Sequence, residues 1–257
     1  MNQIERKLYL IDRLLSENPD YKDIRVPSDE TGQKRLLRGL FNLRTPQKAD
    51  DDFLRVQDEY LQEELAGRGI VSVDDISFNG ESLAIWKGDI TRLGVDAIVN
   101  AANSGMTGCY VPNHTCIDNC IHTYAGVQLR YECGKIMEDQ GYEEPTGQAK
   151  ITSGYNLPCR YVLHTVGPIV QGPVTKRDEE LLVSCYRSCL ELAAENQLES
   201  VAFCCISTGV FHFPNRRAAE IAVQTVRDFK KRDTSVKKVI FNVFKECDEE
   251  IYRDLLG

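Results

Sequence analysis

The stretch DAIVNAANSGMTGCYVPNHTCIDNCIHTYAG, residues 96–126, passes from a strand pattern through a loop into a helix pattern. Its apolar start is typical of a buried strand, which runs into two asparagines and a loop that contains glycine. The fourteen residues from 109 to 122 then hold three cysteines and two of the chain's four histidines. In open α/β sheets, ligands bind at junctions of this kind, and cysteine with histidine is typical of a metal site. We therefore expect a ligand and a metal ion to bind here.

The rest of the chain from about Val71 alternates short apolar runs with amphipathic helical patterns. Several of the apolar runs are continuous, as in strands that are covered on both faces. The clearest helical patterns cover residues 116–139, 179–195 and 215–231. The expected strands are Leu83–Lys87, Ala97–Ala101, Lys150–Ser153, Tyr161–Thr165, Val201–Ile206 and Lys238–Phe244. We therefore predict a three-layer α/β/α domain with a mixed central sheet over residues 71–257.

Residues 1–70 have a different pattern, with apolar residues at helical spacing in three successive sets. The third set ends at Gly67 and Gly69, where a helix would stop. The first set is Ile4, Leu8, Ile11, Leu14 and Leu15. This pattern predicts a small helical N-terminal extension of three amphipathic helices. It carries no obvious chemistry, so we expect it to pack on the main domain, although it could also shape an interface with a partner.

Charge and cysteine content limit the class of protein. The 257 residues carry a formal net charge of -8, which argues against a nucleic-acid binder but allows an anionic ligand held by backbone N–H groups. No apolar run approaches about 18 residues, so we expect no membrane span. The ten cysteines follow no apolar signal region, so we expect reduced thiols and a cytoplasmic location. A monomer is the default expectation.

Three loops follow expected strands, and each suits one part of a nucleotide sugar. In the first loop, Asp89 could accept a hydrogen bond from an exocyclic amine. In the second, Asn100 and Asn103 offer paired amides to sugar hydroxyls. The third, residues 205–214, leads into a helix with small residues whose backbone N–H groups suit a diphosphate, and its Phe211 could stack on a sugar. Together, at one edge of one sheet, the loops predict a site for a nucleotide-diphosphate-sugar.

Several motifs of the chain, in order along residues 83–255, resemble the signature of macrodomains, which bind ADP-ribose and hydrolyse ADP-ribosyl groups. These motifs are Gly88–Ile90, Asp96–Asn103, Gly147–Ala149, His164–Pro168 and Ser207–Gly209. The resemblance implies the three-layer macrodomain fold with a mixed central sheet. It also implies ADP-ribose and mono-ADP-ribosylated protein as ligands.

One stretch departs from the pattern of most hydrolytic macrodomains, which are rich in glycine where this chain has Gly108–Asp118. This departure and the helical extension resemble the zinc-containing class of macrodomains, found in microbial pathogens. Members of this class often occur beside a sirtuin-type ADP-ribosyltransferase and a lipoyl-carrier protein. The resemblance therefore suggests a lipoyl-carrier protein, modified by such a transferase, as a partner.

The resemblance implies one zinc ion per chain, bound by Cys109, His114 and Cys116. Their spacing is not that of a structural zinc finger, and three protein ligands leave a coordination position open, as in catalytic zinc sites. A fourth protein ligand would make the zinc structural instead, and a site without metal is a further alternative. The candidates for such a fourth ligand are Asp118, Cys120 and His122.

The family also implies where ADP-ribose would lie. Adenine would sit against Asp89 and Ile90, and the diphosphate would lie opposite the backbone around Asn113. The diphosphate loop is Ser207, Thr208, Gly209, Val210 and Phe211. The distal ribose would be oriented by Asn100, Asn103 and Asp118. Asn103 and Asp118, with the three zinc ligands, form the expected catalytic set.

We expect a zinc-dependent hydrolase that removes mono-ADP-ribose from modified protein side chains. Zinc would polarise an oxygen or lower the pKa of a bound water. Whether water attacks the anomeric carbon or, in an ester linkage, the acyl carbon stays open. The alternatives are a module that binds ADP-ribose without turnover and a hydrolase of O-acetyl-ADP-ribose. No catalytic role is assigned to His122, His164 or His212.

Overall fold

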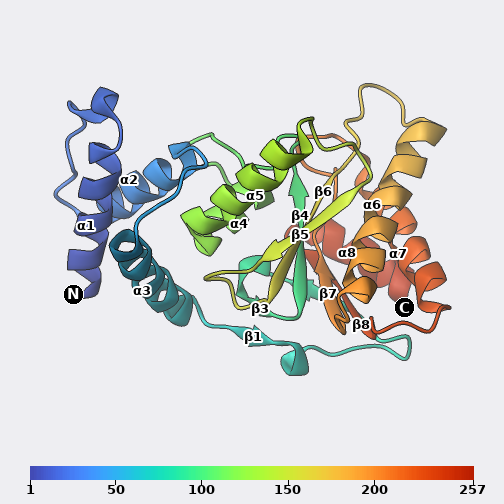
Figure 1. Cartoon of the computed structure of the whole chain (residues 1–257). Coiled ribbons are helices and arrows are strands. Elements are labelled where there is room, and N and C mark those ends of the chain that lie inside the picture. The colour runs from blue at the N-terminus through green and yellow to red at the C-terminus, as the bar shows by residue number, and fades with distance from the viewer.

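The computed structural model describes residues 1–257 as a three-layer α/β/α domain with a helical extension on one side (Figure 1). The central sheet has six strands in the order β2-β8-β7-β4-β6-β5, of which only β5 runs antiparallel to its neighbour. A further two-stranded sheet pairs β1 with β3. The strands are β1 Val71–Ser72, β2 Leu83–Lys87, β3 Leu93–Gly94, β4 Ala97–Ala102, β5 Ala149–Ser153, β6 Tyr161–Val166, β7 Ser200–Phe203 and β8 Lys238–Val243. The predicted fold class, with its mixed sheet, is confirmed.

Helices cover both faces of the sheet. Helices α4 and α5 pack on β4 and β5, whereas α6, α7 and α8 form the layer on the opposite face (Figure 1). The helices are α1 Gln3–Ser16, α2 Glu30–Leu43, α3 Asp51–Arg68, α4 Ile117–Ala125, α5 Val127–Gln140, α6 Lys176–Glu195, α7 Asn215–Lys230 and α8 Glu246–Leu256. None of them is both long and apolar enough to span a bilayer.

The structure corrects two predicted boundaries. The helical pattern at 116–139 is two helices, because the chain turns at Gly126 with φ 96°, a conformation that favours glycine. A Cβ at Gly126 would also lie 2.7 Å from Nε2 of Gln57, a residue of α3. The strand expected at Val201–Ile206 ends at Phe203, and the residues after it begin a loop.

The extension has an apolar core of its own. Eleven buried apolar residues form it, and all but Val127 of α5 come from α1, α2 and α3. This core is separate from the 44-residue core around the main sheet. The expected buried face of α1 was partly wrong, since Ile4 and Leu8 are 58% and 39% exposed while Leu10 is buried. The reason is that α1 turns Leu10, Ile11 and Leu14 towards α2 and α3.

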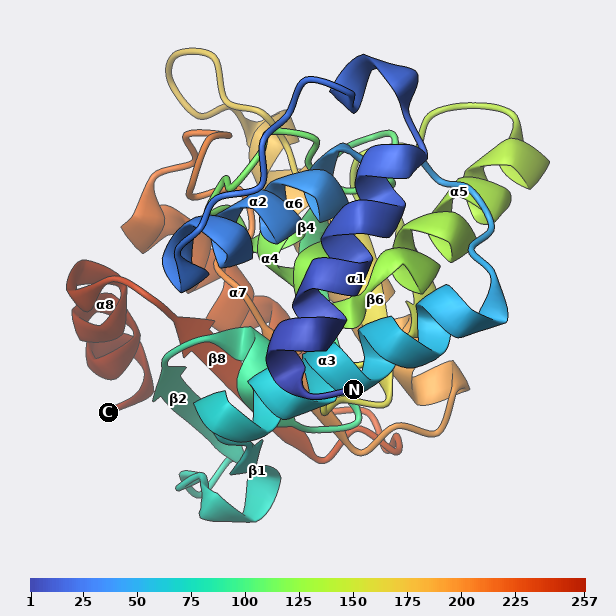
Figure 2. The same ribbon diagram turned by 90° about the vertical axis from the view of Figure 1, so that its left-hand side faces the viewer.

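Helices α1, α2 and α3 lie over α4 and α5 when the molecule is viewed from the extension side (Figure 2). Polar side chains make many of the contacts across this junction. Gln57 of α3, for example, accepts a hydrogen bond from the N–H of Val127 at 2.9 Å and so satisfies the first N–H of α5. The extension therefore reaches the helix layer that carries the predicted site.

Candidate active site

Asp118 lies at the start of α4, directly beyond the end of β4. Its two carboxylate oxygens accept hydrogen bonds from two amides, Asn100 Nδ2 at 2.9 Å and Asn103 Nδ2 at 3.2 Å. Burial raises the pKa of Asp118 to about 6, although both amides and the charge of Arg130 act in the opposite direction. The arrangement fixes the orientation of the carboxyl group and lets it titrate near neutral pH.

Asn100 is fully buried beneath Asp118. Its Nδ2 also lies 3.1 Å from Nδ1 of His164, whose Nε2 lies 2.9 Å from Oγ1 of Thr152. Burial lowers the pKa of His164 to about 3, so this histidine is neutral in the folded protein. The amide of Asn100 has no exposed surface and donates to Asp118, so its expected contact with the sugar stays a prediction.

His122 was given no catalytic role from the sequence, but the structure places it beside Asp118. Its Nε2 lies 3.6 Å from Asp118 Oδ1, and neither ring nitrogen has a hydrogen-bond partner. Burial lowers the pKa of His122 well below its usual value. The spacing of four residues on one helix was the available signal, since such residues share a helix face.

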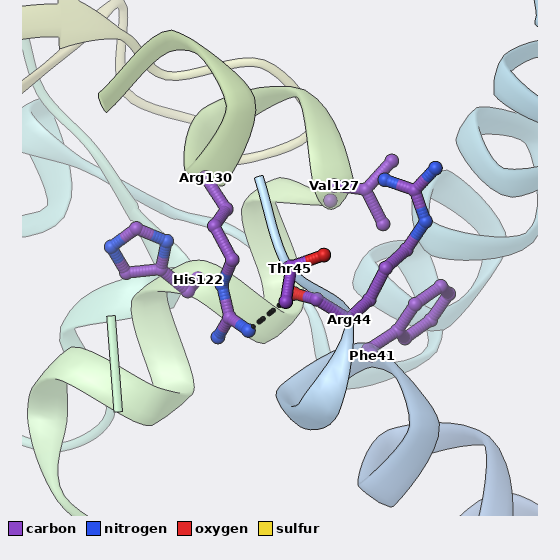
Figure 3. Close-up of a pocket in the computed structure, with 7 residues that line it drawn as sticks. Phe41, Arg44, Thr45, His122, Val127 and Arg130 are labelled. Carbon is purple, nitrogen blue, oxygen red and sulfur yellow. Dashed lines mark hydrogen bonds between the residues drawn. The ribbon is translucent and has the colours of Figure 1, made fainter. Parts of the chain in front are cut away.

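A small cavity lies beside His122 where the extension meets α4 and α5 (Figure 3). Its volume is about 10 Å³, which is room for one water molecule. Arg130 lines it and donates a hydrogen bond to the carbonyl oxygen of Arg44 at 2.8 Å.

Cys109, His114 and Cys116 converge although they occupy an irregular loop. Their candidate ligand atoms all lie within 4.8 Å of one another, and Cys109 Sγ is 3.5 Å from His114 Nδ1. One nitrogen and two sulfurs at this separation suit a tetrahedral zinc ion with one position left for another ligand. None of Asp118, Cys120 and His122, the candidate fourth ligands, belongs to this group.

We call residues 109–116, which contain these three side chains, the metal loop. The protonation state of its thiols decides whether they can bind a cation. Cys116 is the N-cap of α4, and burial raises the pKa of its thiol. A thiol must lose its proton to bind a metal, so the ion would have to offset the cost of a buried thiolate. The fit to zinc comes from the donor types, two sulfurs and one imidazole nitrogen, and binding would release the thiol proton.

The loop at Ser207–Phe211 presents backbone donors to the same edge of the sheet. The N–H groups of Ser207, Gly209, Val210 and Phe211 make no hydrogen bond within the protein. A row of free N–H groups in a turn is a typical anion site, so this geometry agrees with the expected diphosphate position. Thr208 differs, since its N–H donates to the carbonyl of Cys205 at 3.4 Å.

Asn113 does not offer its backbone N–H to a diphosphate. That N–H donates instead to Oδ1 of Asn42, a residue of α2, at 2.8 Å. A contact between the diphosphate and the backbone around Asn113 stays a prediction, and it would need a donor other than this N–H.

In the loop that follows β2, Asp89 is held on both carboxylate oxygens. Its Oδ1 accepts from the N–H and hydroxyl of Thr91 at 3.0 and 2.7 Å, and its Oδ2 accepts from Arg68 Nη1 at 3.0 Å. Arg68 comes from the end of α3 and stacks 3.7 Å above the ring of Tyr124. Ile90 is buried, so it could meet an adenine only through its backbone.

Phe244 was missed by the sequence analysis. It follows β8 directly and is 78% exposed. The N–H of Gly88 donates to the carbonyl of Val243 at 3.0 Å. Because Gly88 precedes Asp89 and Val243 precedes Phe244, this bond brings the backbones of the two loops together. The expected strand Lys238–Phe244 included this residue, whereas β8 ends at Val243 and leaves the aromatic ring exposed.

Backbone strain gathers in these loops. Seven residues other than glycine have positive φ, and Met106, Asn113, Ser207 and His212 are four of them. All four lie in the loops that carry the candidate site residues, and strained backbone of this kind is commonly found at functional sites.

Comparison with known proteins agrees with this geometry. The Macro domain family matches residues 99–222. A protein-ADP-ribose hydrolase of Treponema medium is 58% identical over the full length of both chains. A mutant of the Oceanobacillus iheyensis macrodomain with ADPR aligns with a TM-score of 0.63 at 41% identity, over 70% of this chain and 94% of that chain. The Trypanosoma brucei macrodomain in complex with ADP-ribose aligns with a TM-score of 0.66 at 30% identity, over 85% and 95%.

The fold, the site loops and these comparisons define the class of protein: the chain belongs to the Macro domain family. Within that family it is a hydrolase, as its similarity to protein-ADP-ribose hydrolases over the whole chain shows.

Proposed function

We propose that the chain removes mono-ADP-ribose from modified protein side chains with zinc bound at Cys109, His114 and Cys116. One observation carries the proposal: the same end of α4 holds Cys116 as its N-cap and Asp118 two residues later. The proposed metal ligand Cys116 and a carboxylate whose orientation is fixed by two amides therefore lie within the first turn of one helix. The similarity to a protein-ADP-ribose hydrolase of Treponema medium supports the substrate class.

We place ADP-ribose along the edge of the sheet. Adenine would lie at Asp89, whose carboxylate can accept from an amine, with the exposed ring of Phe244 available for stacking. The diphosphate would take the free N–H groups of the Ser207–Phe211 loop. The distal ribose would then reach Asn103 and Asp118, next to the metal loop.

Asp118 would orient a water molecule or hold a ribose hydroxyl, with Asn100 and Asn103 fixing its two oxygens. Nε2 of His122 lies 3.6 Å from the same carboxyl group. Zinc, when bound, would act as a Lewis acid that polarises an oxygen atom at this end of the cleft. Asp118 supplies either the hydrogen-bond acceptor or the base that the reaction needs.

Two routes use the same oriented water. Attack on the anomeric carbon would pass through an oxocarbenium-like state. If the linkage is an ester, attack could occur on the acyl carbon instead. Hydrolysis in ¹⁸O-labelled water separates them, since the label enters ADP-ribose in the first route and the protein carboxylate in the second.

We further propose a cytoplasmic monomer that acts on a lipoyl-carrier protein modified by a sirtuin-type transferase. The resemblance to the zinc-containing class of macrodomains supports this partner.

The test of the hydrolase is release of ADP-ribose from a mono-ADP-ribosylated protein, measured beside release from O-acetyl-ADP-ribose at matched concentration. Faster turnover of the modified protein would support the proposal. Preference for the ester would point to the small-molecule hydrolase, and binding of ADP-ribose with no turnover of either would leave a module that only binds.

A further inference from the structure

We propose that helix α2 of the N-terminal extension positions the metal loop, and that Arg38 and Asn42 are the residues that do so. The inference rests on the proposed zinc site and assigns a function to the extension. Without these contacts, the loop would not hold Cys109, His114 and Cys116 together before a metal ion arrives.

Arg38 reaches from α2 into the main domain. Its Nη2 donates to the carbonyl oxygen of His114 at 2.8 Å and to Oδ1 of Asn119 at 3.1 Å, and it lies 3.5 Å from Sγ of Cys120. One guanidinium group thus joins the backbone of a metal-loop histidine to the first turn of α4. It fixes the direction in which the His114 side chain leaves the loop.

Asn42 lies one helical turn after Arg38 and holds the residue before His114. Its Oδ1 accepts from the N–H of Asn113, and its Nδ2 donates to Oγ1 of Thr123 at 2.9 Å. Asn113 has φ 58°, so the loop turns sharply here. The hydrogen bond to Asn42 gives the backbone N–H of Asn113, which faces the protein interior in this turn, an acceptor.

Gly39, between these two residues on α2, lets the loop lie directly on the helix. A Cβ at Gly39 would come within 3.3 Å of Asn113 Nδ2 and 3.7 Å of Pro112 Cβ. Glycine inside a helix costs stability relative to alanine, and here it gives the loop room against the helix.

The main domain holds the loop from the other side. Asn119 Nδ2 donates to the carbonyl of Val111 at 3.0 Å, and Arg130 Nη2 donates to that of Cys109 at 3.4 Å. Arg130 also donates to the carbonyls of Asn42 and Arg44, so α2 takes part in this support as well.

The loop has little structure of its own. Between residues 109 and 116 there is one backbone–backbone hydrogen bond, from the N–H of His114 to the carbonyl of Val111 at 3.2 Å. The side chains around it therefore set its shape, and two of them come from residues more than seventy positions earlier in the chain. Loss of groups that orient metal ligands typically weakens metal affinity by about 10–100-fold.

The experiment compares Arg38→Gln with Arg35→Gln in the full chain. Arg35 is an exposed arginine on the same helix with no ion pair or side-chain hydrogen bond, so it controls for the change of charge. Zinc affinity and the rate of zinc release are measured by competition with a chromogenic chelator, and thermal unfolding of the metal-free proteins reports folding. We expect Arg38→Gln to bind zinc at least about tenfold more weakly, Arg35→Gln to match the unaltered chain, and Arg38→Lys to lie between.

The outcomes separate this inference from the zinc proposal. If the unaltered chain binds no zinc, the zinc proposal fails and this inference fails with it. If the unaltered chain binds zinc and both Arg38 variants bind it equally well, the zinc site stands and the role of α2 is overturned. Should Arg38→Gln not fold, Gly39→Leu tests the same contact, since it retains Arg38 and Asn42 but pushes the loop away. Unchanged zinc affinity in a folded Gly39→Leu protein would equally contradict the inference.

Discussion

The two loops that meet at the candidate site are built in opposite ways. The Ser207–Phe211 loop is shaped by its own surroundings in the main domain: Phe213 N–H bonds to the carbonyl of Ser207, and His212 N–H to that of Gly209. The metal loop has one such bond and is held from outside by side chains of α2, α4 and α5. The first loop is thus independent of the extension, whereas the second depends on it.

Cys116→Ala should have the largest effect and should separate the two loops. With one zinc ligand removed, we expect turnover to fall by about a thousandfold or more if zinc supplies Lewis-acid catalysis. Affinity for free ADP-ribose should stay within about threefold, because the Ser207–Phe211 loop and Asp89 are untouched. Hydrolysis assays and titration calorimetry measure the two quantities. Full turnover by a metal-free variant would refute the zinc mechanism.

Asp118→Asn removes the carboxylate but keeps the shape of the side chain. We expect the kcat to fall by about a hundredfold or more, since a positioned acid or base contributes on that scale. Zinc content should be unchanged, because Asp118 is outside the group of three ligands. Steady-state kinetics with elemental analysis tests this, and a change in KM alone would reduce Asp118 to a binding residue.

Gly167→Ala should have the opposite pattern to Cys116→Ala: it should weaken the binding of ADP-ribose and leave the metal loop unaffected. A Cβ there would lie 2.1 Å from Oγ of Ser207 and 2.9 Å from Cγ2 of Ile206, so side chains at the start of the diphosphate loop must shift. We expect the affinity for ADP-ribose to fall by about tenfold, or about 1.4 kcal/mol, while zinc binding is retained. Calorimetry and a zinc assay on the same protein measure both. Loss of zinc with unchanged ADP-ribose affinity would contradict the independence of the two loops.

The smallest effect concerns His164, behind Asn100. Its folded pKa of about 3 lies below its unfolded value of about 6.5, so its contribution to stability is complete above pH 6.5 and is lost as pH falls from there towards 3. Between pH 7.5 and 5.5, the metal-free chain should lose about 1.4 kcal/mol more unfolding free energy than His164→Gln. Urea unfolding at the two pH values tests this. Equal losses would mean that His164 takes up its proton in the folded state.

Much of the fold could be predicted from the sequence, because strands such as β4 and β6 are short, mostly apolar and buried. The turn at Gly126 was missed, since the apolar pattern continues across it and the contact with Gln57 lies far away in the chain. The outward position of Ile4 and Leu8 was missed for a similar reason: the angle at which α1 packs is decided by its neighbours.

Some residues of the candidate site could likewise be predicted from the sequence, whereas others could be found only from the packing. The three candidate zinc ligands lie within eight positions of one another, and the resemblance to zinc-containing macrodomains singled them out before the structure showed that they converge. Arg38 and Asn42 gave no such signal, because ordinary polar residues on a helix become relevant only once that helix is packed on the loop. Asn100 is the opposite case. The sequence indicated it as a site residue, but in the structure it is fully buried beneath Asp118.

The most direct test of the central claim is zinc per chain, measured with hydrolysis of a mono-ADP-ribosylated protein before chelation, after it, and after zinc is returned. We predict about one zinc per chain, loss of turnover on removal without unfolding, and recovery on return. Turnover that is unchanged in the chelated, zinc-free protein would contradict the account.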